Sequence, residues 1–257
     1  MLDALRRLLL PTPRATISDD LWRSAERHLP FLDPLDEQER ADLRAMALAF
    51  LERKVFSGAQ GLVPGNDLRL SVALQACLPV LKLGLGAYDG WSGIIVYPGA
   101  FVIPRRSVDE DGVLHEYDED ALGEAWDGGP VVLAWFDDPA DYDGANVVIH
   151  EFAHKLDMLN GPADGLPPLH ADMDEDAWLD TLDDAYEDFC ALVDEAEAQD
   201  MDTAIDSYAA THPSEFFAVT SEVFFTDPEL LSEDYPELYA QYCLFYRQDP
   251  LARLRRA

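Results

Sequence analysis

The segment ANVVIHEFAHKLDMLN at residues 145–160 constrains the fold most, because His150 and His154 stand four residues apart around Glu151. On a helix, side chains at this spacing project from one face, with Cβ atoms about 5–6 Å apart. Both imidazoles can then bind a single Zn²⁺ at about 2.0–2.1 Å, and Glu151 can reach a water on that ion. The pattern ends at Gly161. We therefore predict a helix that carries part of a metal site; the alternative is two histidines on a partly buried helix face.

The remaining pattern predicts a mainly helical chain with few strands. Short runs rich in β-branched and aromatic residues predict strands at 93–103 and 130–136, just before the histidine helix. Periodic apolar residues predict helices over 19–29, 36–53, 66–84 and 177–199, and prolines at first-turn positions predict helices starting at Pro213 and Pro236. The expected fold class is α+β, predominantly helical, with a small sheet preceding the HExxH helix, and zincin-like.

Chain length bounds the domain organisation. A chain of 257 residues can bury one substantial hydrophobic core. We expect a single catalytic domain over residues 1–257, with an N-terminal helical part at 1–90 and the metal-site core at 91–257.

The charge excludes two classes of partner. The chain has 51 acidic and 18 basic residues, a formal net charge of -33. The acidic residues are spread through the chain, with local clusters at 107–120 and 172–200. Such a surface repels phosphate backbones and anionic lipid, so we expect no nucleic-acid and no membrane partner. A solvated surface suited to high salt explains most of this charge, and it predicts that stability rises with salt.

The cysteines and the apolar segments favour a cytoplasmic protein. Cys77, Cys190 and Cys243 lie far apart with apolar neighbours, which is typical of reduced core residues. The N-terminal segment 1–13 lacks the features of a secretory signal. The longest apolar run, at 74–86, is too short and too interrupted to span a bilayer.

A catalytic zinc ion takes three protein ligands, so a third one must lie outside the HExxH motif. Asp157 lies on the same helix but about 7–8 Å beyond the two histidines along the axis, which suits a supporting role better than ligation. The position six residues after His154 is Asn160, so the longer three-histidine motif is absent. His170 and His212 remain candidates, although both lie in loop-like sequence.

The segment SYAATHPSEFFAVTSEVFF at 207–225 is a better source of the third ligand. Glu215 lies in the first turn of an expected helix with an aromatic face, and Glu222 repeats it two turns later. From the residues alone, either carboxylate can be the ligand or an exposed polar side chain.

Four segments together resemble the Mlc titration factor A family, cytosolic zinc-dependent peptidases of bacteria: CLPVLKLGL, IHEFAHKLDMLNG, DSYAATHPSEFFAVTSEVFF and YCLFYRQDPL. The likeness runs in order from about residue 30 to 256. The resemblance implies that a downstream glutamate completes the metal site and that a tyrosine seven residues earlier lies near the metal. That pattern selects Glu215 over Glu222, and it selects Tyr208. A related Tyr-to-Glu spacing occurs in the catalytic domain of anthrax lethal factor.

The chain departs from related zinc sites at one position. Many glutamate-liganded zinc peptidases carry an aspartate four residues after the ligand to support a histidine, and here that residue is Val219. The residues that support the ligands are therefore unassigned, with Asp157 as a candidate. The family takes its name from binding a transcriptional repressor of sugar uptake, so the resemblance implies such a partner as well as a peptide or protein substrate.

The resulting hypothesis is a metalloprotease. One Zn²⁺ per chain, held by His150, His154 and Glu215, lowers the pKa of its water to about 7, and Glu151 acts as general base. Tyr208 stabilises the oxyanion or, alternatively, only packs. Aminopeptidase-like trimming and internal cleavage both remain open, as does hydrolysis of a non-peptide amide. A regulatory protein-binding module with a catalytically minor zinc site is the alternative from another class.

Overall fold

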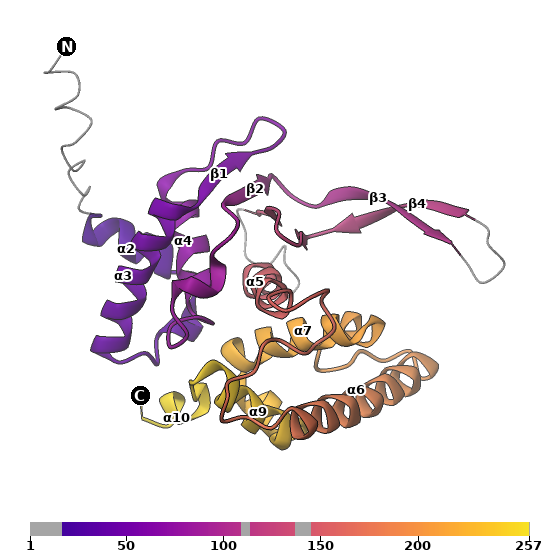
Figure 1. Ribbon diagram of the computed structural model, residues 1–257. Coiled ribbons are helices and arrows are strands. Elements are labelled where there is room, and N and C mark those ends of the chain that lie inside the picture. Colours follow the sequence, from indigo (N-terminus) through magenta and orange to yellow (C-terminus); the bar gives the residue numbers. More distant parts are fainter. Residues whose placement is uncertain (1–16, 109–113, 137–144, 257) are drawn as a thin grey trace, which may run out of the picture.

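The computed structural model describes residues 17–108, 114–136 and 145–256 (Figure 1). The N-terminal segment 1–13 and part of the acidic cluster at 107–120 lie outside these residues. Within them, no helix has both the length and the apolar character needed to cross a membrane.

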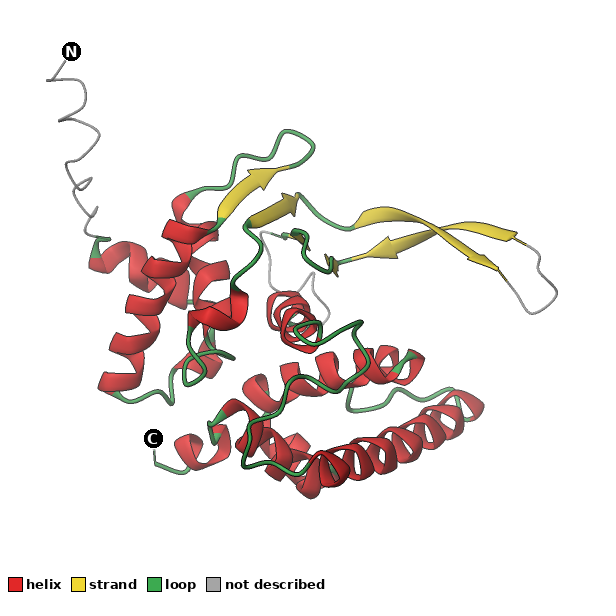
Figure 2. Cartoon of the chain, in the orientation of Figure 1, coloured by secondary structure: helices red, strands yellow, loops and turns green. Residues whose placement is uncertain are grey.

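Helices dominate the described chain, and the strands are few and short (Figure 2). The α-helices are α2 (Asp19–Glu26), α3 (Glu37–Arg53), α4 (Asn66–Cys77), α5 (Val147–Asp157), α6 (Glu175–Ala198), α7 (Pro213–Thr226), α8 (Pro228–Asp234), α9 (Pro236–Tyr246) and α10 (Pro250–Leu254). The strands are β1 (Val55–Gly58), β2 (Gly93–Tyr97), β3 (Phe101–Val108), β4 (Leu114–Ala121), β5 (Gly123–Ala125) and β6 (Val131–Ala134). Short 3-10 helices are η1 (Pro30–Leu32), η2 (Leu85–Tyr88) and η4 (Ser207–Thr211). The predicted α+β, predominantly helical fold class is confirmed.

The sheet has four strands in the order β1-β2-β6-β5. The first three are parallel and β5 runs antiparallel to β6. The strand predicted at 130–136 is β6, which is paired on both sides and therefore offers no exposed edge to an extended substrate. The edge next to the predicted site is β5, which the sequence analysis missed because three residues carry too little periodicity.

Strands β3 and β4 form a separate antiparallel ribbon that projects from the body (Figure 1). The predicted strand at 93–103 is therefore two strands, β2 and the start of β3, in two different sheets. At the base of the ribbon, Phe101 packs with Val132 and Ala134 in a small cluster apart from the main core.

Helix α5 lies at the centre of the molecule, between the sheet and α7 (Figure 1). Its side chains are almost all buried, which explains why it is apolar around most of its circumference. Phe152 packs against Phe50, Tyr88 and Trp91 on the side of the N-terminal helices. A helix enclosed in this way holds its functional side chains in fixed positions.

Local signals explain where the C-terminal helices begin. Helices α7 and α9 start at Pro213 and Pro236, as predicted from the preference of proline for a first turn. The three cysteines carry free thiols, with Cys77 fully buried and Cys190 and Cys243 partly so.

Candidate metal centre

Two helices bring three donor atoms together. His150 and His154 project from one face of α5, and Glu215 projects from the first turn of α7. Glu215 Oε2 lies 3.1 Å from His150 Nε2 and 3.1 Å from His154 Nε2. The two histidine Nε2 atoms are also 3.1 Å apart. These donors could hold a metal ion.

These three donor atoms form a triangle that fits a zinc ion by donor type and by size. Two imidazoles and one carboxylate are a known catalytic ligand set that leaves a fourth position open. In a tetrahedral site with bonds of about 2.0–2.1 Å, ligand atoms lie roughly 3.3–3.4 Å apart. The observed separations of 3.1 Å are close to this value, so little movement separates the ligands from binding geometry.

Glu222 supports the first histidine. Its Oε1 lies 2.7 Å from His150 Nδ1, and its Oε2 accepts a hydrogen bond from the main-chain N–H of Asn146 at 2.6 Å. A carboxylate at Nδ1 favours the tautomer with the proton on Nδ1, which leaves the Nε2 lone pair facing the other ligands. The spacing of seven residues places Glu222 two turns after Glu215 on the same face of α7.

The carboxylates also determine the charge of this group in the metal-free state. Burial disfavours the protonated form of His150, but Glu215 and Glu222 outweigh burial and raise the pKa of His150 well above its usual value. Burial by itself would raise the pKa of Glu215, yet hydrogen bonds from His150 and His154 hold that pKa well below its usual value. Because metal ligands must be deprotonated, the two carboxylates make zinc binding at this centre compete with a proton on His150.

The candidate base, Glu151, is almost completely buried beside the triangle. It is 4% exposed, and its Oε2 has no hydrogen-bond partner within the described part of the chain. Burial raises the pKa of Glu151 to about 8. A cation on the neighbouring ligands would counter this effect, because it favours the carboxylate form.

Gly123 in β5 makes room for Glu151. A Cβ atom at this position would lie 2.2 Å from Glu151 Oε1, far inside van der Waals contact. Only glycine lets the edge strand approach the candidate base this closely.

Tyr208 lies on η4, next to the histidine that Glu222 supports. Its ring centroid is 6.3 Å from that of His150, and its side chain is 45% exposed. Asp206 accepts a hydrogen bond from the Tyr208 main-chain N–H at 2.9 Å and so fixes the start of η4. The tyrosine is thus near the centre but is not packed into the core.

The second histidine does not receive such support from the described residues. His154 Nδ1 is buried and has no hydrogen-bond partner among the described residues. Asp157, the predicted support, is fully buried and accepts a hydrogen bond from the Gly165 N–H through Oδ2, while its Oδ1 has no partner in the described chain. Asp157 therefore holds the loop after α5 in place, and the residue in contact with a ligand is Glu222.

The other two candidate histidines lie elsewhere. His170 Nε2 donates to the carbonyl oxygen of Phe245 at 2.8 Å. His212 caps α7, where its Nδ1 accepts from the main-chain N–H of Ser214 at 3.2 Å. Neither joins the triangle of donors.

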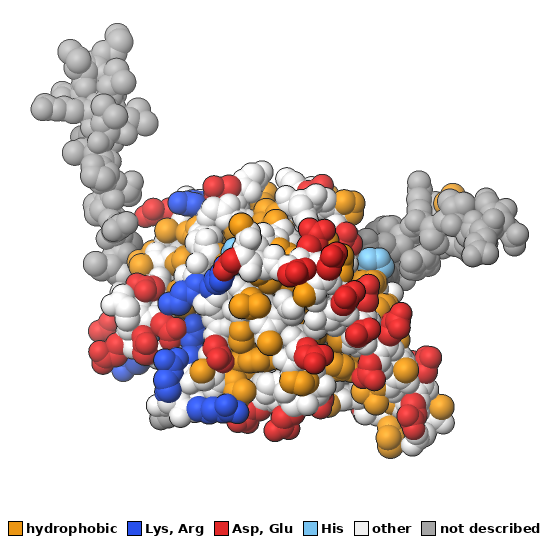
Figure 3. Space-filling model, turned by 60° about the horizontal axis from the view of Figure 1, so that its bottom comes forward, with side chains coloured by type: hydrophobic (Ala, Val, Ile, Leu, Met, Phe, Trp, Pro, Cys, Tyr) orange, Lys and Arg blue, Asp and Glu red, His pale blue; other side chains and the backbone are white. Residues whose placement is uncertain are grey.

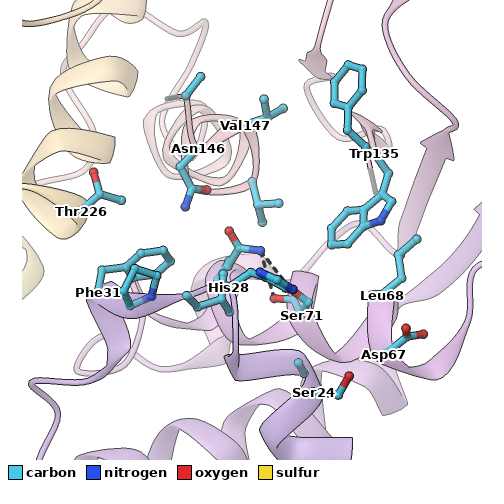
Figure 4. Close-up of a pocket in the computed structure, with 17 residues that line it drawn as sticks. Ser24, His28, Phe31, Asp67, Leu68, Ser71, Trp135, Asn146, Val147 and Thr226 are labelled. Atoms are coloured by element: carbon cyan, nitrogen blue, oxygen red, sulfur yellow. Dashed lines mark hydrogen bonds between the residues drawn. The ribbon is translucent and has the colours of Figure 1, made fainter. Parts of the chain in front are cut away.

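A cavity of about 290 Å³ opens onto the centre. Its walls include His150, Glu151, Tyr208 and Gly123, so one candidate ligand, the candidate base and the tyrosine face one space. A different cavity of about 440 Å³ lies on the other side of the N-terminus of α5 (Figure 4). That cavity includes His28 and Trp135 but none of the three ligands, so size alone does not identify the site.

The sequence analysis missed two site residues, Glu222 in its observed role and Gly123. The repeat of glutamate at a spacing of seven was a usable signal for Glu222. No local signal pointed to Gly123, because its role depends on a strand and a helix that are distant in sequence.

Comparisons with known proteins identify the family of this chain. The family model of the glucose-regulated metallo-peptidase M90 matches residues 5–247. The chain is 43% identical to Mlc titration factor A of Serratia proteamaculans over 91% of its length and 89% of that relative. It is 41% identical to the proteins of the same name from Yersinia enterocolitica and Yersinia pestis, over 91% of this chain and 88% and 87% of theirs. The chain therefore belongs to the glucose-regulated metallo-peptidase M90 family.

Proposed function

We propose that this chain is a zinc-dependent peptidase in which His150, His154 and Glu215 hold one Zn²⁺ per chain. The convergence of their three donor atoms at 3.1 Å beside a buried glutamate carries the proposal. When bound, the ion would act as a Lewis acid toward water and the scissile carbonyl. A peptide or protein is then the substrate.

Glu151 is the proposed general base. Its unpartnered Oε2 accepts the proton of the attacking water and later delivers it to the amine that leaves. Gly123 allows this carboxylate its position, and the buried surroundings exclude water that would compete for the proton.

Tyr208 is the proposed donor to the oxyanion that develops on the scissile carbonyl. Its hydroxyl can donate a hydrogen bond, and its ring lies on the cavity wall next to His150. Its partial exposure suits a group that must meet a substrate.

The substrate main chain is proposed to lie along β5. Leu122 and Trp126 make main-chain hydrogen bonds toward β6 and its turn. Because antiparallel pairing alternates, the main-chain groups of Gly123 and Ala125 point away from β6, toward the outer edge of the sheet. An extended peptide could pair there by strand addition, next to Glu151.

Metal analysis combined with peptide hydrolysis tests the proposed function. We expect about one zinc per chain, and hydrolysis that a chelator abolishes and zinc restores. Matched peptides with free and acetylated N-termini separate aminopeptidase-like cleavage from internal cleavage. A zinc-loaded protein that hydrolyses none of a broad peptide panel would contradict the proposal.

A second candidate function rests on the name of the relatives. They are called Mlc titration factor A, which supports a role for this chain in binding a transcriptional regulator. In that case the zinc site contributes little to catalysis. Binding of purified Mlc by a Glu151→Gln variant, at wild-type affinity, would support this role independently of hydrolysis.

A further inference from the structure

The charge of this protein is strongly segregated along the chain. Residues 83–246 contain 39 of the 51 acidic residues but only three of the 18 basic ones: Arg105, Arg106 and Lys155. Of these, Lys155 is only 4% exposed, and its ammonium donates hydrogen bonds to the carbonyl oxygens of Trp126 and Gly129. In Figure 3, Lys and Arg side chains gather on the left of the view, among Asp and Glu, whereas the right of the view shows Asp and Glu without them.

Both cavities at the metal centre are built from this acidic segment. The first, described above, also includes the exposed Asp120 and Asp206. A second cavity of about 520 Å³ continues from it and shares Asp206, Val219 and Glu222 with it. Two cavities elsewhere differ, since those beside α3 and α10 include Lys54 and Arg253.

The second cavity combines an apolar wall with acidic residues. Val193, Ile205 and Val219 are buried and form part of the wall. Glu197, Asp202 and Asp206 also line it, and all three are exposed. A long side chain with an aliphatic stem and a cationic end matches both features, because the stem is buried while the charge stays near carboxylates and water.

A polar group in the adjoining first cavity also points to a ligand. Glu151 is more than nine-tenths buried, faces that cavity and leaves Oε2 without a partner in the described chain. The second cavity adjoins the space in front of Glu151, because Asp206 and Val219 line both cavities.

We propose that the second cavity is a specificity subsite for a lysine or arginine side chain of the peptide substrate. The aliphatic stem packs against Val193, Ile205 and Val219, and the cation lies between Asp202 and Asp206. This inference rests on the proposed peptidase function, because it assigns a substrate class to the same site. A free N-terminal ammonium has the same charge but lacks the stem, so it would not fill the apolar wall.

Isomeric peptides test the subsite against simple attraction to an acidic protein. The peptides are acetylated, share one neutral background and carry a single arginine at successive positions, so that their net charge is constant. Binding is measured by fluorescence anisotropy with zinc-loaded Glu151→Gln, and cleavage sites are mapped with the wild-type enzyme. We expect one arginine position to bind roughly tenfold more tightly than its isomers, with cleavage at a fixed distance from it.

Matched variants assign the effect to the cavity. Glu197→Gln/Asp202→Asn should reduce the positional preference at least fivefold. Asp183→Asn/Asp184→Asn removes the same charge from exposed positions of α6 that line neither cavity, and it should leave the preference unchanged.

The outcomes separate this inference from the proposed function. Equal affinity for all isomers overturns the subsite, as does a preference that survives Glu197→Gln/Asp202→Asn. Tighter binding of a neutral peptide with a free N-terminus than of any acetylated arginine isomer also overturns it, in favour of an ammonium site. Hydrolysis of neutral peptides without positional preference leaves only the peptidase function standing, whereas position-dependent binding without any hydrolysis leaves only the subsite standing.

Discussion

The segment at 83–246 and the two ends that flank it use charged residues in opposite ways. In the flanks, carboxylates pair with arginine: Glu26 accepts two hydrogen bonds of 2.8 Å from Arg44, and Glu39 accepts from Arg253 at 2.8 Å. In the acidic segment, Glu215 and Glu222 face histidine instead. Where described acids of this segment do meet arginine, as in Arg53–Asp89, the arginine comes from a flank.

This difference separates stability from chemistry. Paired charges in the flanks join elements that are distant in sequence, such as α3 and α10 through Glu39 and Arg253. Several carboxylates of the acidic segment lie instead at the metal centre or along its cavities, among them Glu215, Glu222 and Asp206. We therefore expect substitutions at the centre to change metal binding or turnover, and substitutions in the flanks to change the free energy of unfolding.

The largest effect is expected from Glu151→Gln. Peptide hydrolysis should fall about 10²–10⁴-fold, because glutamine cannot accept the proton of the attacking water. Zinc content and melting temperature should stay close to those of the wild type, since glutamine preserves the shape of the side chain. Steady-state kinetics beside metal analysis measures both, and turnover near the wild-type rate would remove Glu151 as the base.

The next largest effect is expected from a substitution in the flanks. Arg253→Met should lower the free energy of unfolding by about 2–3 kcal/mol, because it leaves the largely buried Glu39 without its main partner. The kcat of the remaining folded protein should not change. Denaturant unfolding with activity at low denaturant tests this, and a selective loss of kcat at normal stability would break the comparison.

Glu39 also makes the flanks sensitive to acid. Burial opposes ionisation of Glu39, but Arg253 outweighs burial and lowers the pKa of Glu39 below its usual value of 4.5. A depressed folded-state pKa stabilises the protein above the unfolded-state pKa, and this stabilisation is lost as pH falls through the folded-state pKa. The unfolding free energy of Glu39→Gln should therefore fall less than that of the wild type between about pH 5 and pH 3. Parallel acid-unfolding curves for the two proteins would contradict this assignment.

A smaller effect is expected from substitution of Glu222, which supports His150. Glu222→Ala should weaken zinc binding about 10–100-fold by releasing His150, whereas Glu215→Ala should lose more because it removes a ligand. Glu222 thus affects the metal through His150, although the resemblance selects Glu215 as the ligand. Competition with a chromogenic chelator gives the affinities, and full zinc affinity in Glu222→Ala would show that this support is dispensable.

Salt is expected to change the melting temperature through the whole acidic segment, and its effect is the smallest when it is counted per residue. Its many acidic residues repel one another with few basic residues nearby, so the melting temperature should rise between low and molar salt. A flank variant such as Arg44→Gln should show the same rise, because its own ion pair is only a local feature. A melting temperature independent of salt would mean that the excess charge costs no stability.

The sequence by itself determined the parts of this protein that depend on local patterns. Helix α5, with candidate ligands at i and i+4 and the candidate base at i+1, follows from a 3.6-residue period, and the starts of α7 and α9 follow from proline. From the residues alone, Glu215 and Glu222 were favoured as the third ligand over His170 and His212, and the family resemblance then selected Glu215. Both glutamates proved to lie at the centre, one toward each nitrogen of His150.

Tertiary structure decided everything that joins distant segments. It placed Glu222 behind His150, put Gly123 against Glu151, made β5 rather than β6 the edge strand, and continued the site cavity past Asp206. No periodic pattern in the sequence reports these contacts, because each one joins elements that are separated by a turn, a strand or a helix. Pairing of strands and docking of helices depend on packing of the whole chain, so a pattern within one segment cannot specify them.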